Sequence, residues 1–111
     1  MTLDFAEFTA EARSEFLRLP RPLQVQLRAH TAYLLSHPYR SYPWLQVKEL
    51  RDLPGVWKFR LGTKRVFYIV DGSVLVYVAI VARPPAYTAA TRAEVRRLLA
   101  DRRRKPTLHS L

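Results

Sequence analysis

Short β-forming runs, each followed by a turn signal, occupy the second half of the chain and constrain its fold more than any other feature. The runs are rich in β-branched and aromatic residues and cover residues 47–50, 56–61, 65–70 and 74–82. The turn signals between them are Pro54-Gly55, Gly62-Thr63 and Asp71-Gly72. Strands so close in sequence pair with their neighbours, so the pattern predicts an antiparallel meander.

Asp71-Gly72 is the strongest turn signal, because a two-residue type I′ turn needs positive φ at both central positions. A turn there places Val70 opposite Ser73 and Arg65 opposite Val78. A second two-residue turn at Gly62-Thr63 places Arg60 opposite Arg65.

Alternation then assigns each strand residue to one of two faces. The face that we expect helices to cover is nearly all apolar and comprises Trp57, Phe59, Leu61, Val66, Tyr68, Val70, Leu75, Tyr77, Ala79 and Val81. The other face comprises Val56, Lys58, Arg60, Arg65, Phe67, Ile69, Val74, Val76, Val78 and Ile80. Its charges gather at one end.

Arg60 opposite Arg65 is a pairing that folding alone disfavours, since like charges across a strand pair repel unless an anion lies between them. We interpret the pair as an anion site. The alternative is a solvated sheet face whose long side chains spread into water. A three-residue loop at Gly62-Thr63 would place Lys58 and Arg65 on opposite faces and remove the argument.

The first 37 residues predict a strand and two helices. Leu3, Phe5 and Glu7 alternate on one side of a short edge strand, and Thr9 caps a helix that runs to about Leu17. Two prolines then stop that helix, and an amphipathic helix follows over residues 22–37. We expect the two to pack as a helical hairpin.

Residues 38–46 form a predicted loop rich in tyrosine, serine and proline, with Trp44 among them. Its aromatic side chains either anchor the loop to the domain or offer a platform for nucleobases. A last helix is expected over residues 89–103, and residues 102–111 are expected to be a flexible basic tail.

At 111 residues the chain is expected to form one domain, residues 1–111, of the α+β class: an N-terminal helical hairpin packed on a twisted antiparallel meander, with a C-terminal helix. It has no cysteine, so disulfides and thiolate zinc sites are excluded, and we expect neither a metal nor a cofactor. No apolar run reaches the ~20 residues that span a bilayer and no secretory leader is evident, so a cytoplasmic protein without a membrane partner is expected.

Lys and Arg number 19 against 9 acidic residues, a formal net charge of +10. Such a charge on a small domain favours a polyanionic partner that releases counterions on binding, and nucleic acid is the leading class. A generally basic soluble protein is the alternative.

The stretch from Leu50 to Gly62, followed by Lys64-Arg65-Val66-Phe67-Tyr68, resembles the signature of the RelE/ParE toxin superfamily. Arg83-Pro84-Pro85-Ala86-Tyr87 looks like the family's closing Arg-x-x-x-Tyr motif. Helical hairpin, meander and final helix also fit, so the resemblance covers nearly the whole chain.

The resemblance implies a ribosome-dependent mRNA endonuclease in which a ribose 2′-hydroxyl attacks the adjacent phosphate without a metal. Carried over by position, Lys58 would be a base or phosphate ligand. Arg60 would occupy the family's next basic position on the same sheet face. Arg65 would hold the scissile phosphate, Arg83 would stabilise its developing charge, and Tyr87 would stack on a base or donate a proton. Neighbouring arginines would disfavour the ammonium form of Lys58, as a general base requires.

Two features depart from the family pattern. Ala82 stands where many members have a histidine, and Pro84-Pro85 replaces a basic-acidic pair. The three histidines, His30, His37 and His109, are expected to be core-edge or surface residues. Glu49 is a weak candidate base, since a glutamate beside a lysine is usually a surface charge.

The predicted partners are mRNA, the ribosome with its rRNA, and a small antitoxin that masks the site. Additional RNA contacts are expected from Lys48, Lys64, Arg92, Arg96 and Arg97. Two other functions stay open: inhibition of DNA gyrase, as in the ParE branch, and a non-catalytic member that holds an antitoxin or operator DNA.

Overall fold

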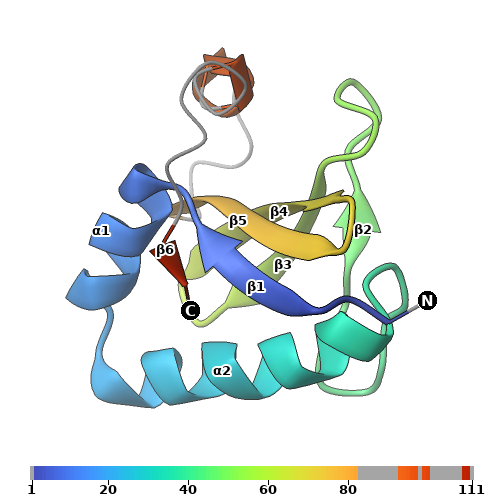
Figure 1. Ribbon diagram of the computed structural model, residues 1–111. Helices are drawn as coiled ribbons and strands as arrows, with labels where there is room; N and C mark the ends of the chain where they lie inside the picture. Colours follow the sequence, from blue (N-terminus) through green and yellow to red (C-terminus); the bar gives the residue numbers. More distant parts are fainter. Residues whose placement is uncertain (1, 83–92, 98, 101–108, 111) are drawn as a thin grey trace.

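The computed structural model describes residues 2–82, 93–97, 99–100 and 109–110. One six-stranded sheet forms its centre, with the strand order β2-β3-β4-β5-β1-β6 (Figure 1). The strands are β1 (Phe5–Phe8), β2 (Lys48–Glu49), β3 (Trp57–Leu61), β4 (Lys64–Asp71), β5 (Val74–Ala82) and β6 (His109–Ser110). Strands β2 to β5 are the predicted antiparallel meander.

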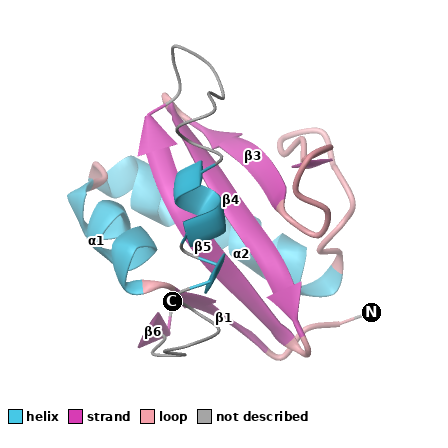
Figure 2. Ribbon diagram, turned by 90° about the horizontal axis from the view of Figure 1, so that it is seen from above, coloured by secondary structure: helices cyan, strands magenta, loops and turns pink. Residues whose placement is uncertain are grey.

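Helices lie on both faces of this sheet. Helices α1 (Ala10–Arg18) and α2 (Arg21–Ser36) bury apolar side chains against one face. The C-terminal helical segment, residues 93–97 and 99–100, packs Val95 and Leu99 on the other face, in front of β4 and β5 in Figure 2. The predicted α+β class is confirmed, although α1 and α2 run in different directions across Leu19-Pro20 (Figure 1) rather than as a close hairpin.

The β3–β4 hairpin has the predicted two-residue loop, Gly62-Thr63, so Leu61 pairs with Lys64 and Arg60 with Arg65. Gly62 adopts a φ of 59°, in the left-handed region. A Cβ at Gly62 would also lie 3.1 Å from the methyl carbons of Leu23 in α2. Glycine is therefore required twice here, by the turn and by the contact with α2.

The β4–β5 hairpin differs from the prediction. Asp71 pairs with Val74, so the loop is Gly72-Ser73 and not Asp71-Gly72. Gly72, at a φ of 62°, takes the first central position of the loop. Asp71 remains in β4, and the register shifts so that Val70 pairs with Leu75 and not with Ser73.

A β-bulge interrupts the same pair of strands, because Phe67 pairs with Ala79 but Tyr68 pairs with Tyr77. Val78 is thus the extra residue of β5. Beyond the bulge, β5 side chains exchange faces: the prediction that Ala79 and Val81 lie under α1 and α2 is wrong, as is the placement of Ile80 opposite them. Arg65 consequently lies opposite Val81 and not Val78.

The side chain of Thr9 connects the bulge of β5 to the start of α1. Its hydroxyl donates to the carbonyl of Val78 (2.8 Å) and accepts from the amide of Ala12 (3.2 Å). The predicted N-cap of α1 is therefore confirmed, and the same side chain fixes the irregular point of β5.

Strand β1 lies between β5, which it joins in parallel, and β6, which it joins antiparallel. The prediction of an edge strand is therefore wrong. Its buried residues are Ala6 and Phe8, whereas Phe5 is 45% exposed. Residues 109–110 of the expected flexible tail form β6, which corrects that expectation at these two positions. Residues 101–108 and 111 lie outside the described part.

The core between the sheet and α1 and α2 contains two buried tyrosines whose hydroxyls are hydrogen-bonded. Tyr68 donates to the carbonyl of Pro38 (2.6 Å), and the Tyr77 hydroxyl pairs with that of Thr31. Burial raises the pKa of both phenols well above the ordinary value, so both stay neutral. Among the described residues, no helix combines the length and apolar character that crossing a membrane requires.

Candidate nucleic-acid interface

Four basic side chains project from the sheet face opposite α1 and α2, and we call them the basic patch: Lys48, Lys58, Arg60 and Arg65. Lys48 pairs directly with Lys58 across β2 and β3, and Arg60 pairs with Arg65 across β3 and β4. Lys58 and Arg60 are two residues apart in β3 and so share a face. The structure thus brings together three predicted catalytic residues and one predicted RNA-binding residue.

The basic patch contains two like-charged cross-strand pairs, where the sequence had predicted one. Directly opposed side chains in a sheet have Cβ atoms only ~5 Å apart, and like charges there oppose folding. Lys48 and Arg60 are exposed, whereas Lys58 and Arg65 are half-buried. A bound phosphate, shared by several cations, would relieve this repulsion.

An apolar floor borders the basic patch. Phe67 lies directly opposite Lys58 and is buried together with Val56, Leu50 and Ala79. Val95 and Leu99 of the C-terminal helical segment complete this cluster. Because the floor excludes water from one side, electrostatic interactions with an anion at the patch are strengthened.

Glu49 belongs to a different part of the structure. It pairs with Trp57, and so lies on the opposite side of the sheet from Lys58. Its carboxylate accepts a hydrogen bond from the amide of Gly55 (2.8 Å) and thereby fixes the turn that precedes β3. Glu49 is a structural residue in this geometry and not a neighbour of the patch.

The remaining predicted site residues are dispersed. Lys64 pairs with Leu61 and Ala82, on the sheet face opposite the basic patch. Arg96 is exposed on the C-terminal helical segment, and Arg97 forms an ion pair with Glu94, whose pKa it lowers by hydrogen bonding. The predictions for Arg83, Tyr87 and Arg92 fall on residues outside the described part.

The histidines do not join the patch. His30 is buried in α2, with its Nδ1 atom 2.9 Å from the Tyr42 hydroxyl, and burial lowers its pKa. His37 is exposed beside the ring of Tyr33, and His109 lies in β6. Over the described residues, no group of three potential ligands is placed to hold a metal ion.

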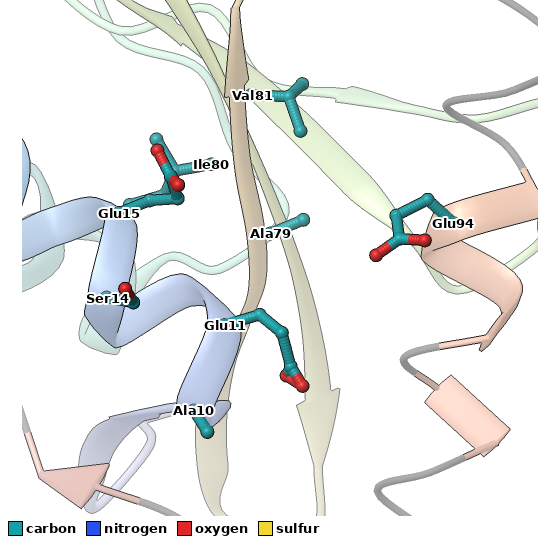
Figure 3. Close-up of a pocket in the computed structure, with 8 residues that line it drawn as sticks. All are labelled: Ala10, Glu11, Ser14, Glu15, Ala79, Ile80, Val81 and Glu94. Carbon is teal, nitrogen blue, oxygen red and sulfur yellow. The ribbon is translucent and has the colours of Figure 1, made fainter.

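A pocket of about 510 Å³ between α1, β5 and the C-terminal helical segment was not predicted from the sequence. Figure 3 shows Glu11, Glu15 and Glu94 around it. The spacing of Glu11 and Glu15, one helical turn apart, was the available signal. Glu15 and Glu94 form ion pairs with Arg18 and Arg97, and a pocket of carboxylates repels phosphate, so it is distinct from the candidate interface.

Comparison with known proteins gives a consistent result at the level of structure. No family model matches the sequence, and no curated protein matches it. Among solved structures, a free-state variant of the E. coli toxin RelE is 20% identical and aligns with a TM-score of 0.68, covering 87% of this chain and 97% of that one. The chain has the RelE toxin fold.

Two toxin–antitoxin complexes show the same likeness. The RelBE2 complex from Mycobacterium tuberculosis is 26% identical, with a TM-score of 0.57, and covers 71% of this chain and 96% of that one. The archaeal RelE–RelB complex from Pyrococcus horikoshii OT3 is 20% identical, with a TM-score of 0.65, and covers 78% and 100%. In these three comparisons the alignment with this chain thus covers nearly the full length of the related chain.

Proposed function

We propose that the chain is a toxin of a toxin–antitoxin system that cleaves mRNA on the ribosome. The observation that carries this proposal is the basic patch, in which Arg60 faces Arg65 with Lys58 on the same surface. The RelE fold of the chain, shared with a RelE toxin and with RelE in complex with its antitoxin, supports the toxin class.

The proposed reaction uses the RNA's own nucleophile. The ribose 2′-hydroxyl attacks the adjacent phosphorus, a new P–O bond forms, and the bond to the 5′-oxygen of the next nucleotide breaks. The 2′-hydroxyl loses a proton and the leaving oxygen gains one. The protein therefore has to stabilise the charge on the non-bridging oxygens and move two protons.

Three residues of the basic patch have a role in the proposed reaction. Arg65, half-buried on the apolar floor, holds the scissile phosphate, because a guanidinium keeps its charge and donates in a fixed plane. Arg60 shares the developing charge from the opposite strand. Lys58 accepts the 2′-hydroxyl proton. Arg83 and Tyr87 are proposed as transition-state ligand and proton donor from the sequence pattern alone.

A protein antitoxin is the proposed inhibitor. Three of the similar solved structures are complexes of RelE or RelBE2 toxins with antitoxins. Since the basic patch gathers four cations on one sheet face, an acidic or extended antitoxin segment over it would neutralise both like-charged pairs and exclude RNA. A cytoplasmic location is proposed together with this function.

The test is cleavage of a defined message on programmed ribosomes, read by primer extension. Arg65→Ala and Arg83→Ala are expected to lower the cleavage rate by roughly 10²-fold or more, as for removal of one charge-stabilising donor. Arg13→Ala, the same truncation at an exposed site on α1, is the matched control and retains the rate. An intact message with the wild-type protein, together with blocked supercoiling by gyrase, would instead assign the chain to the gyrase-inhibiting branch.

A further inference from the structure

Two aromatic side chains of the loop between α2 and β2, Tyr39 and Trp44, are exposed, and the half-buried Trp57 of β3 lies beside Tyr39. We call these three residues the aromatic surface. Trp44 is 79% exposed and Tyr39 46% exposed, the largest exposures of aromatic residues in the described part of the chain. The rings of Tyr39 and Trp57 lie 5.0 Å apart at an interplanar angle of 34°. Exposed apolar rings that gather on one surface are typical of interaction sites.

The loop that carries Trp44 is held in place by several contacts. Tyr42 and Leu45 exchange two backbone hydrogen bonds, each 2.9 Å, so Pro43 and Trp44 form the tip of a tight turn. Leu45 is buried, and the Tyr42 hydroxyl is hydrogen-bonded to His30 in α2. Trp44 therefore projects from a fixed support, which reduces the ordering cost of binding.

The charge around the aromatic surface has one sign along the sequence. Between Glu15 and Glu49 the chain contains no acidic residue. The same stretch contains Arg18, Arg21, Arg28, Arg40 and Lys48, and Arg40 lies between Tyr39 and the turn. The loop of Tyr39 and Trp44 thus carries only cations, and Glu49, opposite Trp57, accepts a hydrogen bond from the Gly55 amide. A loop of this charge is complementary to a polyanion with exposed bases.

Trp57 of the aromatic surface and Lys58 of the basic patch lie near the same edge of the sheet, on opposite faces. Trp57 and Lys58 are neighbours in β3, so their side chains point to opposite faces at the same position. Only the two-residue strand β2 lies beyond them, and Figure 1 shows it at the margin of the molecule. An RNA strand bound at Lys58 would have to pass around β2, one strand spacing of ~5 Å beyond β3, to reach Trp57 on the other face.

From these observations we propose that the aromatic surface stacks on unpaired bases of the RNA strand whose phosphate lies at the basic patch. The ligand class is single-stranded RNA, and this inference rests on the proposed function. Stacking on the aromatic surface adds a second contact, away from the reacting phosphate. This contact distinguishes unstacked from stacked bases but does not distinguish one base from another. Duplex RNA cannot use it, because its bases already stack on one another.

The experiment titrates the protein with a single-stranded 2′-O-methyl oligouridine, which lacks the nucleophile and stays intact. In a Trp57→Phe background Trp44 is the only tryptophan, and its fluorescence is expected to fall on binding. Trp44→Ala is expected to weaken binding by about tenfold or more, as stacking on one base contributes. The dependence of affinity on salt should stay unchanged, since stacking releases no counterions.

Matched variants separate this proposal from the proposed function. Leu17→Ala, also at an exposed apolar residue, should bind as the wild type does, and Trp44→Phe should retain most of the affinity. Arg65→Ala should lower both affinity and salt dependence while Trp44 is still quenched. Trp44→Ala binding as tightly as the wild type, or no quenching of Trp44, overturns the aromatic surface. An uncleaved message with Trp44 still quenched overturns only the nuclease.

Discussion

The helix-covered face of the sheet and the face opposite it treat polar groups in different ways. On the covered face Tyr68 and Tyr77 are buried, and each hydroxyl has a defined hydrogen-bond partner. On the opposite face Arg60 stands against Arg65, and Lys48 against Lys58. The covered face pairs these two hydroxyls within the domain, while the other face places charges of one sign side by side.

Both faces are built from the same strands, and successive residues of a strand point to opposite faces. The difference between the faces therefore arises from alternate residues. Phe59 points into the core while its neighbours Lys58 and Arg60 point to the patch. Along β3, Phe59 therefore supplies buried apolar surface to the core, whereas Arg60 is exposed. The faces should therefore respond oppositely to truncation.

The largest effect is expected from Phe59→Ala. Phe59 is 2% exposed and contacts the rings of His30, Tyr68 and Tyr77. Loss of that ring leaves a cavity and should reduce the free energy of unfolding by roughly 3–5 kcal/mol, measured by urea denaturation. Arg60→Ala, one residue along, is the control, with a change within about 0.5 kcal/mol. Equal losses at both positions would remove the distinction between the faces.

A smaller effect is expected where α1 meets the bulge of β5. Thr9→Ala removes the cap of α1 and leaves the carbonyl of Val78 without the hydroxyl that donates to it. The expected loss is about 1–2 kcal/mol by urea denaturation. Thr9→Ser keeps the hydroxyl and should retain most of the stability. A serine variant as unstable as the alanine variant would assign the effect to the methyl group.

That bulge marks the limit of what the sequence could predict. Alternation and the Gly62-Thr63 turn were enough to place Arg60 opposite Arg65, since two-residue turns fix register. The extra residue at Val78 depends on Thr9, 69 positions away, so no local pattern shows it. Alternation carried through β5 therefore assigned Ala79, Ile80 and Val81 to the wrong faces.

Other differences have the same origin in distant contacts. Asp71-Gly72 and Gly72-Ser73 are both acceptable turn pairs, and the pairing of the whole hairpin decides between them. β1 was predicted as an edge strand because its partners, β5 and β6, follow it by 60 residues or more. Of the candidate site, the Arg60 and Arg65 pair was predicted, but Lys48 opposite Lys58 required the position of β2.

The pH dependence of stability tests the burial of His30 on the covered face. Burial lowers its pKa, so the unfolded chain takes up this proton at a higher pH than the folded protein does. Its contribution to stability is present above the ordinary pKa of 6.5 and is lost as the pH falls below that value. His30→Phe should flatten this part of the stability profile, whereas Tyr42→Phe should retain it, because burial and not the hydroxyl lowers the pKa. An unchanged profile in His30→Phe would contradict this assignment.

The smallest expected change in stability has the opposite sign. Arg60→Gln removes one charge of the Arg60 and Arg65 pair while keeping a polar, exposed side chain. The free energy of unfolding should rise by a few tenths of a kcal/mol, about the magnitude of a cross-strand charge pair, and the gain should shrink as salt screens the repulsion.

The same variant should lose RNA cleavage, which makes it the sharpest test of the comparison. A substitution that raises stability at low salt and lowers the cleavage rate identifies a residue that serves function and destabilises the folded protein. Arg18→Gln is the matched control, because Arg18 is ion-paired with Glu15 and its loss should lower stability slightly and leave cleavage intact. If Arg60→Gln instead destabilises the protein at low salt, the two arginines are held favourably by the domain itself, and their juxtaposition no longer points to a phosphate.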